Sequence, residues 1–263
     1  MQMITRDGVA LHYRDEGPKD GLTLVFANSL GTDFRVWDPL LPHLPEGLRI
    51  LRYDKRGHGL SDAPPAPYQM DDHIGDVAAI IDHVGARDVV FVGLSIGGLI
   101  AQGLWAARPD LFRAIALVDT GHKIGTEEIW NERISTVEAA GIAPLADAVM
   151  ERWFSAEFRA NEPQLALWRN MLVRTTADGY AGSSAAIRDV DFTAVATSIA
   201  VPTLCVVGTE DGSTPPALVK ELSELVAGAR YAEIDGVGHI PCVEAPERLG
   251  ALLTGFMREI GLI

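Results

Sequence analysis

The chain has 263 residues, 48% of them hydrophobic, and a formal net charge of −14. This hydrophobic content supports a sizeable core and excludes a disordered chain, while the acidic surface would repel nucleic acid and anionic membranes, so we expect neither as a partner. Two cysteines fit a reducing compartment without a disulfide framework, and no spacing of Cys and His indicates zinc, so we predict no metal.

The N-terminal stretch MQMITRDGVALHYRDEG contains charges early and no long apolar run. It does not have the pattern of a secretory signal, so we expect a cytoplasmic protein. No apolar run elsewhere approaches the ~20 residues of a membrane span. Within the stretch, VALHYRDEG alternates apolar and polar residues, which predicts an antiparallel strand at the edge of a sheet.

Short runs that are apolar at their centres predict strands covered on both faces. They span residues 22–28, 48–54, 88–93, 114–119, 202–208 and 230–235. Helical patterns lie between most of them, at residues 70–85, 97–112 and, at the end of the chain, 245–260. Strands that alternate with helices predict an α/β fold with a mainly parallel, doubly wound sheet flanked by helices.

The alternation stops between about Gly121 and Phe192, where the sequence is helical in composition and has no clear strand. This stretch is too long for a simple crossover and too rich in tryptophan for a linker. We therefore predict a core domain of residues 1–120 and 193–263, with residues 121–192 as a helical cap inserted after the strand that ends at Asp119. The alternative is that the stretch pads the outer helical layer.

The segment GLSIG at residues 93–97 matches G-x-S-x-G between a predicted strand and a predicted helix. That context is typical of a nucleophile elbow, a strained turn that lifts a serine above the sheet edge. The glycines would allow close approach of neighbouring backbone. We therefore predict Ser95 as a nucleophile; the alternative is a glycine-rich turn with a capping serine.

A serine nucleophile needs a base, and two histidines lie in glycine-rich loops after strands. These are His239 and His58. Open α/β sheets build their sites at such strand ends. The chain order Ser, Asp, His typical of the elbow architecture favours His239, because only this histidine comes late enough.

The orienting acid should lie between Ser95 and His239 along the chain. Glu210 and Asp211 end the strand at 202–208, and Asp211 is favoured because glycine and STPP follow it. Asp119, after the preceding strand, is the alternative. The acid would fix the His239 tautomer and stabilise its imidazolium.

An oxyanion hole needs two N–H donors. One should come from Ile96, the residue after the nucleophile, and the other from the loop after an early strand. Here that loop contains NSLGTD, which places the Leu30 N–H as the second donor.

At this point the chain resembles the α/β-hydrolase superfamily over nearly its whole length, and more narrowly the 3-oxoadipate enol-lactonases of the β-ketoadipate pathway. The segments GLSIGG and RGHG occur throughout the superfamily, whereas NSLGTD, WNERI and GYAGSSAAIRD are the narrower signals. A serine at position 95 argues against the haloalkane dehalogenases, which have an aspartate there.

The resemblance implies a hydrolase without a cofactor that opens 3-oxoadipate enol-lactone, a small anionic lactone, in the degradation of aromatic compounds. Esterases, perhydrolases and C–C bond hydrolases share this core, so a carboxylesterase for small esters is the alternative enzyme. A ligand-binding protein without catalysis is the alternative from another class.

The implied substrate carries a carboxylate, so a local cation should offset its desolvation. We favour Arg133, because Trp130 lies three residues before it on the same helical face. Trp153 is expected to line the same wall, and Arg188 is the next candidate. The alternative for Arg133 is a solvated arginine paired with a glutamate of its own helix, either Glu128 or Glu138.

Overall fold

Eight strands form one sheet in the computed structural model, which describes residues 1–263. Their order is β1-β2-β4-β3-β5-β6-β7-β8. The pairs β1–β2 and β2–β4 are antiparallel and all other neighbours are parallel. The predicted fold class is therefore confirmed. The strands are β1 (Gln2–Arg6), β2 (Val9–Glu16), β3 (Thr23–Ala27), β4 (Arg49–Tyr53), β5 (Val89–Leu94), β6 (Phe112–Val118), β7 (Thr203–Gly208) and β8 (Arg230–Ile234).

VALHYRDEG forms an antiparallel strand as predicted, but the prediction that it is the edge strand is wrong. This segment is β2, and β1 lies outside it. Asp7 and Gly8 join the two strands with φ of 50° and 81°. Positive φ at both central residues is the geometry of the tight hairpin turn that Asp-Gly favours, so the missed signal was present in the sequence.

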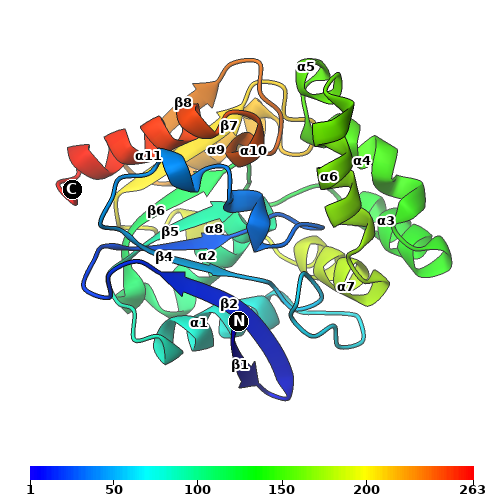
Figure 1. The fold of residues 1–263 in the computed structure, drawn as a ribbon, viewed down its shortest axis with the longest axis horizontal. Helices are drawn as coiled ribbons and strands as arrows, with labels where there is room; N and C mark the ends of the chain where they lie inside the picture. Colours follow the sequence, from blue (N-terminus) through cyan, green and yellow to red (C-terminus); the bar gives the residue numbers. More distant parts are fainter.

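Helices cover both faces of the sheet. Figure 1 shows α1 (Met70–His83) and α2 (Ile96–Ala107) packed together, with α11 (Pro246–Glu259) lying against the other side near β8. The remaining core helices are α8 (Thr193–Ala196), α9 (Pro216–Leu225) and α10 (Pro241–Glu244), with short 3-10 turns η1 (Phe34–Trp37), η2 (Leu41–His43) and η3 (Pro109–Leu111).

Two helix predictions need correction. The helix expected at 97–112 ends at Ala107, because Pro109 opens a 3-10 turn and Phe112 already belongs to β6. Proline has a fixed φ and no N–H, so it disfavours continuation of the helix. Helix α9 was not predicted. It begins at Pro216, the second proline of a Pro-Pro pair.

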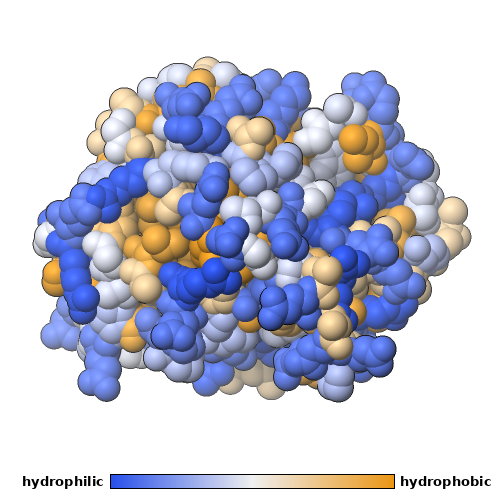
Figure 2. Space-filling model, turned by 90° about the horizontal axis from the view of Figure 1, so that it is seen from above, coloured by the Kyte–Doolittle hydropathy of each residue, from blue (hydrophilic) through white to orange (hydrophobic).

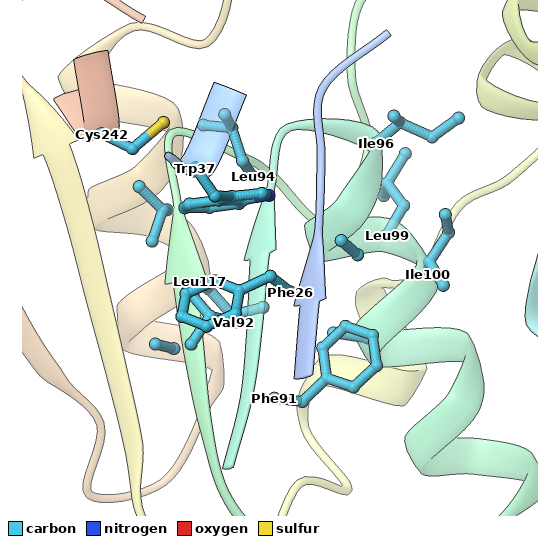
Figure 3. Close-up of a cluster of buried hydrophobic side chains, with 14 of the residues drawn as sticks. Phe26, Trp37, Phe91, Val92, Leu94, Ile96, Leu99, Ile100, Leu117 and Cys242 are labelled. Carbon is cyan, nitrogen blue, oxygen red and sulfur yellow. The ribbon is translucent and has the colours of Figure 1, made fainter. Parts of the chain in front are cut away.

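The core is formed by side chains on both faces of β3, β5 and β6. Figure 3 shows Phe91 pointing toward α2, whereas Val92 points toward the side that holds Trp37 and Cys242. On that side the rings of Phe26 and Trp37 lie 4.9 Å apart. Because both faces of β5 are covered, the strand is buried at every position.

Residues 121–192 contain five helices and no strand. Figure 1 shows these helices grouped beside the sheet, on the right of the view. Two of these helices, at Ala146–Trp153 and Ala156–Arg159, are separated by a short break, and Ser155 caps the second. The group consists of α3 (Glu127–Ala140), α4 (Ala146–Trp153), α5 (Ala156–Arg159), α6 (Glu162–Val173) and α7 (Ala177–Arg188), with a 3-10 turn η4 (Ala143–Leu145) between α3 and α4.

The surface seen from above is mostly polar (Figure 2). Figure 2 shows a mostly hydrophilic face, with an apolar area on the side of the molecule that holds α11 and β8. None of the helices combines the length and the apolar character that a membrane crossing requires.

Candidate active site

Ser95 sits at a strained bend between β5 and α2. Its φ of 59° and ψ of −120° are unusual for a residue with a side chain. The Ser95 N–H donates to the carbonyl oxygen of Val118 at 3.0 Å, and the Thr120 hydroxyl donates to the Ser95 carbonyl oxygen at 2.6 Å. The end of β6 therefore holds the bend in place.

The glycines around Ser95 are required by close backbone approaches. A Cβ on Gly93 would lie 2.3 Å from the Gly97 carbonyl oxygen, and one on Gly97 would lie 2.0 Å from the Ala27 carbonyl oxygen. A Cβ on Gly98 would lie 2.5 Å from the Thr120 side chain. Any larger residue at these positions would push α2 away from β3 or from the loop after β6.

His239 and Asp211 lie together in loops that follow β8 and β7. His239 Nδ1 is 2.9 Å from Asp211 Oδ2, and both side chains are buried. Nδ1 therefore carries the proton that it donates to the carboxylate, which leaves Nε2 as the basic nitrogen. Nε2 lies 3.5 Å from the Ser29 hydroxyl.

Asp211 is held as an anion by several donors. Its Oδ1 accepts the N–H groups of Ser213 and Thr214 at 2.7 and 3.0 Å, and its Oδ2 accepts the Thr214 hydroxyl at 2.6 Å. Burial alone would raise the pKa of Asp211, but His239 and Thr214 outweigh it and lower that pKa. A carboxylate in this state can stabilise an imidazolium at His239.

Ser95 and His239 line the same cavity, which has a volume of about 280 Å³. Ser95 Oγ makes no side-chain hydrogen bond and is free to meet a ligand. Hydrogen bonds between nucleophile and base are often long without substrate and tighten when it binds. The arrangement thus offers a nucleophile, a base and an acid along one edge of the sheet.

Asp119, the alternative acid, has a different environment. It is fully buried, with φ of 43°, and its Oδ1 accepts the Gly208 N–H at 2.9 Å. Burial, and after it the charge of Asp211, raises the pKa of Asp119 well above its ordinary value. Asp119 makes no hydrogen bond to His239. Glu210, the other candidate, is exposed.

His58, the alternative base, is occupied at both ring nitrogens. Nε2 accepts the Gly31 N–H at 3.0 Å, and Nδ1 is 3.1 Å from the Arg56 carbonyl oxygen. Burial, and after it the nearby Lys55, lowers the pKa of His58 well below its ordinary value. The ring is a neutral structural support for the loop at 28–31.

Two backbone donors are free beside the serine. Neither the Leu30 nor the Ile96 N–H donates to a protein acceptor. Ile96 is the first residue of α2, where the N–H has no acceptor within the helix and the helix dipole favours negative charge. Leu30 lines the cavity itself. The pair could therefore stabilise an oxyanion formed at Ser95.

Aromatic side chains and two arginines form the wall of the cavity on the side of residues 121–192. Trp130 and Trp153 are both buried there. Arg133 places its Cζ 4.7 Å from the Trp130 ring centre, and no carboxylate lies within 4 Å of it. The alternative pairing of Arg133 with Glu128 or Glu138 is therefore not observed.

The second arginine, Arg152, was missed by the sequence analysis. It lines the cavity next to Trp153 and also has no carboxylate partner. Burial, and after it the charge of Arg133, lowers the pKa of Arg152. No sequence signal marks it, because adjacent residues of a helix do not share a face.

Arg188, the second choice for binding a carboxylate, lies outside the cavity. Its guanidinium binds Asp189 at 2.6 Å and the side-chain oxygen of Asn131 at 2.7 Å. Although Ile187 lines the cavity, Arg188 follows it at the C-terminal end of α7 and turns to these surface partners.

The C-terminal end of α4 is hydrogen-bonded to both loops of the candidate triad. The Arg152 carbonyl oxygen accepts the Gly212 N–H at 3.2 Å, and the Trp153 carbonyl oxygen accepts the His239 N–H at 2.8 Å. The element that contributes Arg152 and Trp153 to the cavity therefore also fixes the positions of Asp211 and His239.

Helix α7 rests on the loop that contains His58. A Cβ on Gly179 would lie 2.0 Å from the Gly57 carbonyl oxygen, and one on Gly182 would lie 2.7 Å from the Tyr68 ring. These contacts give a physical reason for glycine at both positions of GYAG.

We expect Gly179→Ala to lower the free energy of unfolding by about 1–3 kcal/mol, because the added methyl would overpack the contact with Gly57. Gly255→Ala is the matched control, since Gly255 is exposed on α11 with nothing within 4 Å of its added Cβ. That control should be neutral or stabilising by up to ~1 kcal/mol. Urea unfolding of both variants measures the difference, and equal stabilities would contradict the close contact.

Comparisons with known proteins show the family of the chain. The profile of the Alpha/beta hydrolase family matches residues 24–252. The chain is 31% identical to 3-oxoadipate enol-lactonase 2 of Acinetobacter baylyi, over 97% of this chain and 96% of that one. It is 34% identical to 3-oxoadipate enol-lactonase 1 of the same organism, over 98% and 97%. The crystal structure of the enol-lactonase from Burkholderia xenovorans LB400 superposes with a TM-score of 0.94 at 37% identity, covering 98% of this chain and 100% of that one.

Proposed function

Because the chain belongs to the alpha/beta hydrolase family, we propose that it is an enol-lactonase that uses Ser95, His239 and Asp211 as a catalytic triad. The proposed substrate is 3-oxoadipate enol-lactone and the product is 3-oxoadipate, in the degradation of protocatechuate or catechol. The similarity to proteins of that name supports this substrate.

In the acylation step, Ser95 Oγ attacks the lactone carbonyl carbon while His239 Nε2 takes the hydroxyl proton. The Leu30 and Ile96 N–H groups stabilise the oxyanion, and one such donor is commonly worth ~10²–10³ in rate. The ring C–O bond then breaks, and its electron pair leaves on the enol oxygen. His239 then gives its proton to the enol oxygen, which returns the imidazole to its neutral form for the next step. Because an enolate is a better leaving group than an alkoxide, this proton donation is less demanding here.

In the deacylation step, His239 takes a proton from water, and the hydroxide attacks the acyl carbon. The bond to Ser95 Oγ breaks, and the serine regains its proton from His239. Because the leaving group of a lactone stays attached to the acyl chain, a single product is released. The enol becomes the ketone by tautomerisation.

The proposal of an anionic substrate rests on two arginine side chains in the cavity that have no carboxylate partner. Arg133 and Arg152 both line it, and neither has a carboxylate within 4 Å. Two partly buried cations without a counter-ion favour a ligand with a carboxylate. The cavity volume of about 280 Å³ lies at the low end of the range for small-molecule sites, which suits a small lactone.

The test is to measure ring opening of the enol-lactone by the loss of its ultraviolet absorbance, beside hydrolysis of p-nitrophenyl acetate. We expect kcat/KM for the enol-lactone to exceed that for the uncharged ester by orders of magnitude. A preference for the uncharged ester would favour the carboxylesterase alternative, and no turnover of either would favour the non-catalytic binding protein.

We expect Arg133→Leu and Arg152→Leu each to raise KM for the enol-lactone by about 10- to 100-fold, the range for a lost charge-assisted hydrogen bond. Hydrolysis of p-nitrophenyl acetate should stay nearly unchanged. Arg188→Leu is the matched control and should affect neither substrate. Equal losses on both substrates would mean damage to the wall of the cavity instead of lost carboxylate recognition.

A further inference from the structure

Lys55 is a fully buried cation that the mechanism above does not use. It follows β4, and its side chain reaches under the loop at residues 28–31. Nζ donates to the Ser29 carbonyl oxygen at 2.9 Å and to the Asn28 carbonyl oxygen at 3.1 Å. No carboxylate lies within 4 Å of Nζ. A buried ammonium without an ion pair is costly, so its position requires a reason.

The geometry of one peptide group supplies that reason. The Ser29 carbonyl and the Leu30 N–H belong to the same peptide unit, which is trans. In a trans peptide the C=O and N–H bonds point in opposite directions. The Ser29 carbonyl oxygen accepts Lys55 Nζ and also the Thr32 N–H at 3.3 Å and the Thr32 hydroxyl at 2.9 Å. Lys55 is the charged member of this set, and with the carbonyl held on that side the Leu30 N–H points the other way, toward the cavity that Leu30 lines.

The next peptide group, between Leu30 and Gly31, is also held by a buried side chain. The Gly31 N–H donates to His58 Nε2, and Gly31 itself has φ of 75°, in the left-handed region. Lys55 and His58 come from the same segment after β4. Together they leave the Leu30 N–H as the donor of this turn that is directed at the reacting atoms.

We infer that Lys55 is a positioning residue for the oxyanion hole, which fixes the Ser29–Leu30 peptide so that its N–H meets the developing negative charge. This inference rests on the proposed function, which makes the Leu30 N–H an oxyanion donor. The ammonium also polarises the peptide that it binds, and hydrogen bonds in series strengthen one another. Its positive charge lies on the far side of that peptide from the oxyanion and favours it further.

Because Lys55 can lose its charge, its proposed role should make turnover depend on pH. Burial lowers the pKa of Lys55 to about 7, although Asp54 and Asp33 act to raise it. His58 and His73, the other titratable groups that Lys55 affects, are both held neutral by burial. As pH rises through that value, Lys55 loses its charge but keeps N–H groups for both carbonyls. Turnover should therefore fall on the alkaline side without loss of the loop structure.

The test is Lys55→Met, which keeps the length and apolar stem but removes the charge and the donors. We expect kcat to fall about 10- to 100-fold with KM within about twofold, because the oxyanion contact exists only in the transition state. The alkaline decline of kcat seen in the wild type should be absent in the variant. Lys19→Met, at an exposed lysine, is the matched control and should change neither value.

Wild-type kcat in a correctly folded Lys55→Met, or a loss confined to KM with the alkaline decline retained, would overturn the inference. If the variant does not fold, the wild-type profile decides: a kcat that stays flat from pH 6 to about 9 overturns it. The proposed function fails separately, if the wild type opens no enol-lactone at any pH.

Discussion

Ser95→Ala is expected to lower kcat for the enol-lactone by roughly 10⁴–10⁶-fold, as in enzymes where nucleophile and base act as a unit. The free energy of unfolding should change little, because Ser95 Oγ makes no side-chain hydrogen bond and the bend is held through the Ser95 backbone by Val118 and Thr120. The substitution should therefore slow the chemical step without unfolding the protein. Single-turnover ring opening at saturating substrate measures this effect.

The double variant Ser95→Ala, His239→Ala tests whether the two side chains act together as nucleophile and base. Once the nucleophile is gone, loss of the base should cost little more, since His239 acts by taking the Ser95 proton. If the two losses instead multiplied, the side chains would be acting independently and the acyl-enzyme mechanism would be wrong.

The second large effect is expected for Asp211→Asn, at about 10⁴-fold in kcat, the loss found when a triad aspartate becomes an amide. An asparagine would lose the charge that stabilises the imidazolium, and it could offer an N–H to His239 Nδ1, which favours the wrong tautomer. Circular dichroism should accompany the assay, because Asp211 also accepts the Ser213 and Thr214 N–H groups.

Asp119→Asn is the matched comparison, and it should cost far less. Asp119 makes no hydrogen bond to His239, and burial and Asp211 raise the pKa of Asp119, which disfavours its charged form. An amide of the same shape keeps the acceptor for the Gly208 N–H. Equal losses in the two variants would contradict the assignment of Asp211 as the orienting acid.

Local sequence signals were sufficient for the central strands and for the elbow. Apolar runs identify strands that are covered on both faces, and the glycines around Ser95 are required by contacts with residues near in sequence or in adjacent strands. The same kind of signal, Asp-Gly with alternating residues on each side, would have found the β1–β2 hairpin.

The roles of the other site residues depend on contacts between residues far apart in the sequence. Hydrophobic periodicity does not report such contacts. His58 and His239 both follow strands in glycine-rich loops, and chain order favours His239. The ring contacts then distinguish the two, because His58 Nε2 is occupied by the Gly31 N–H whereas His239 Nδ1 meets Asp211. Arg133 was found because Trp130 shares its helical face, whereas Arg152 and Arg188 could be separated only by how α4 and α7 pack against the core.

The central claim is that Ser95 is acylated by the lactone, and intact-mass spectrometry after an acid quench tests it most directly. Because the leaving enolate stays tethered to the acyl group, the adduct must have the mass of the whole lactone, with no fragment lost. We expect that adduct within the first turnover, on the peptide that contains Ser95, and none on Ser95→Ala. Turnover without any adduct on Ser95, or an equal adduct on the alanine variant, would contradict the account.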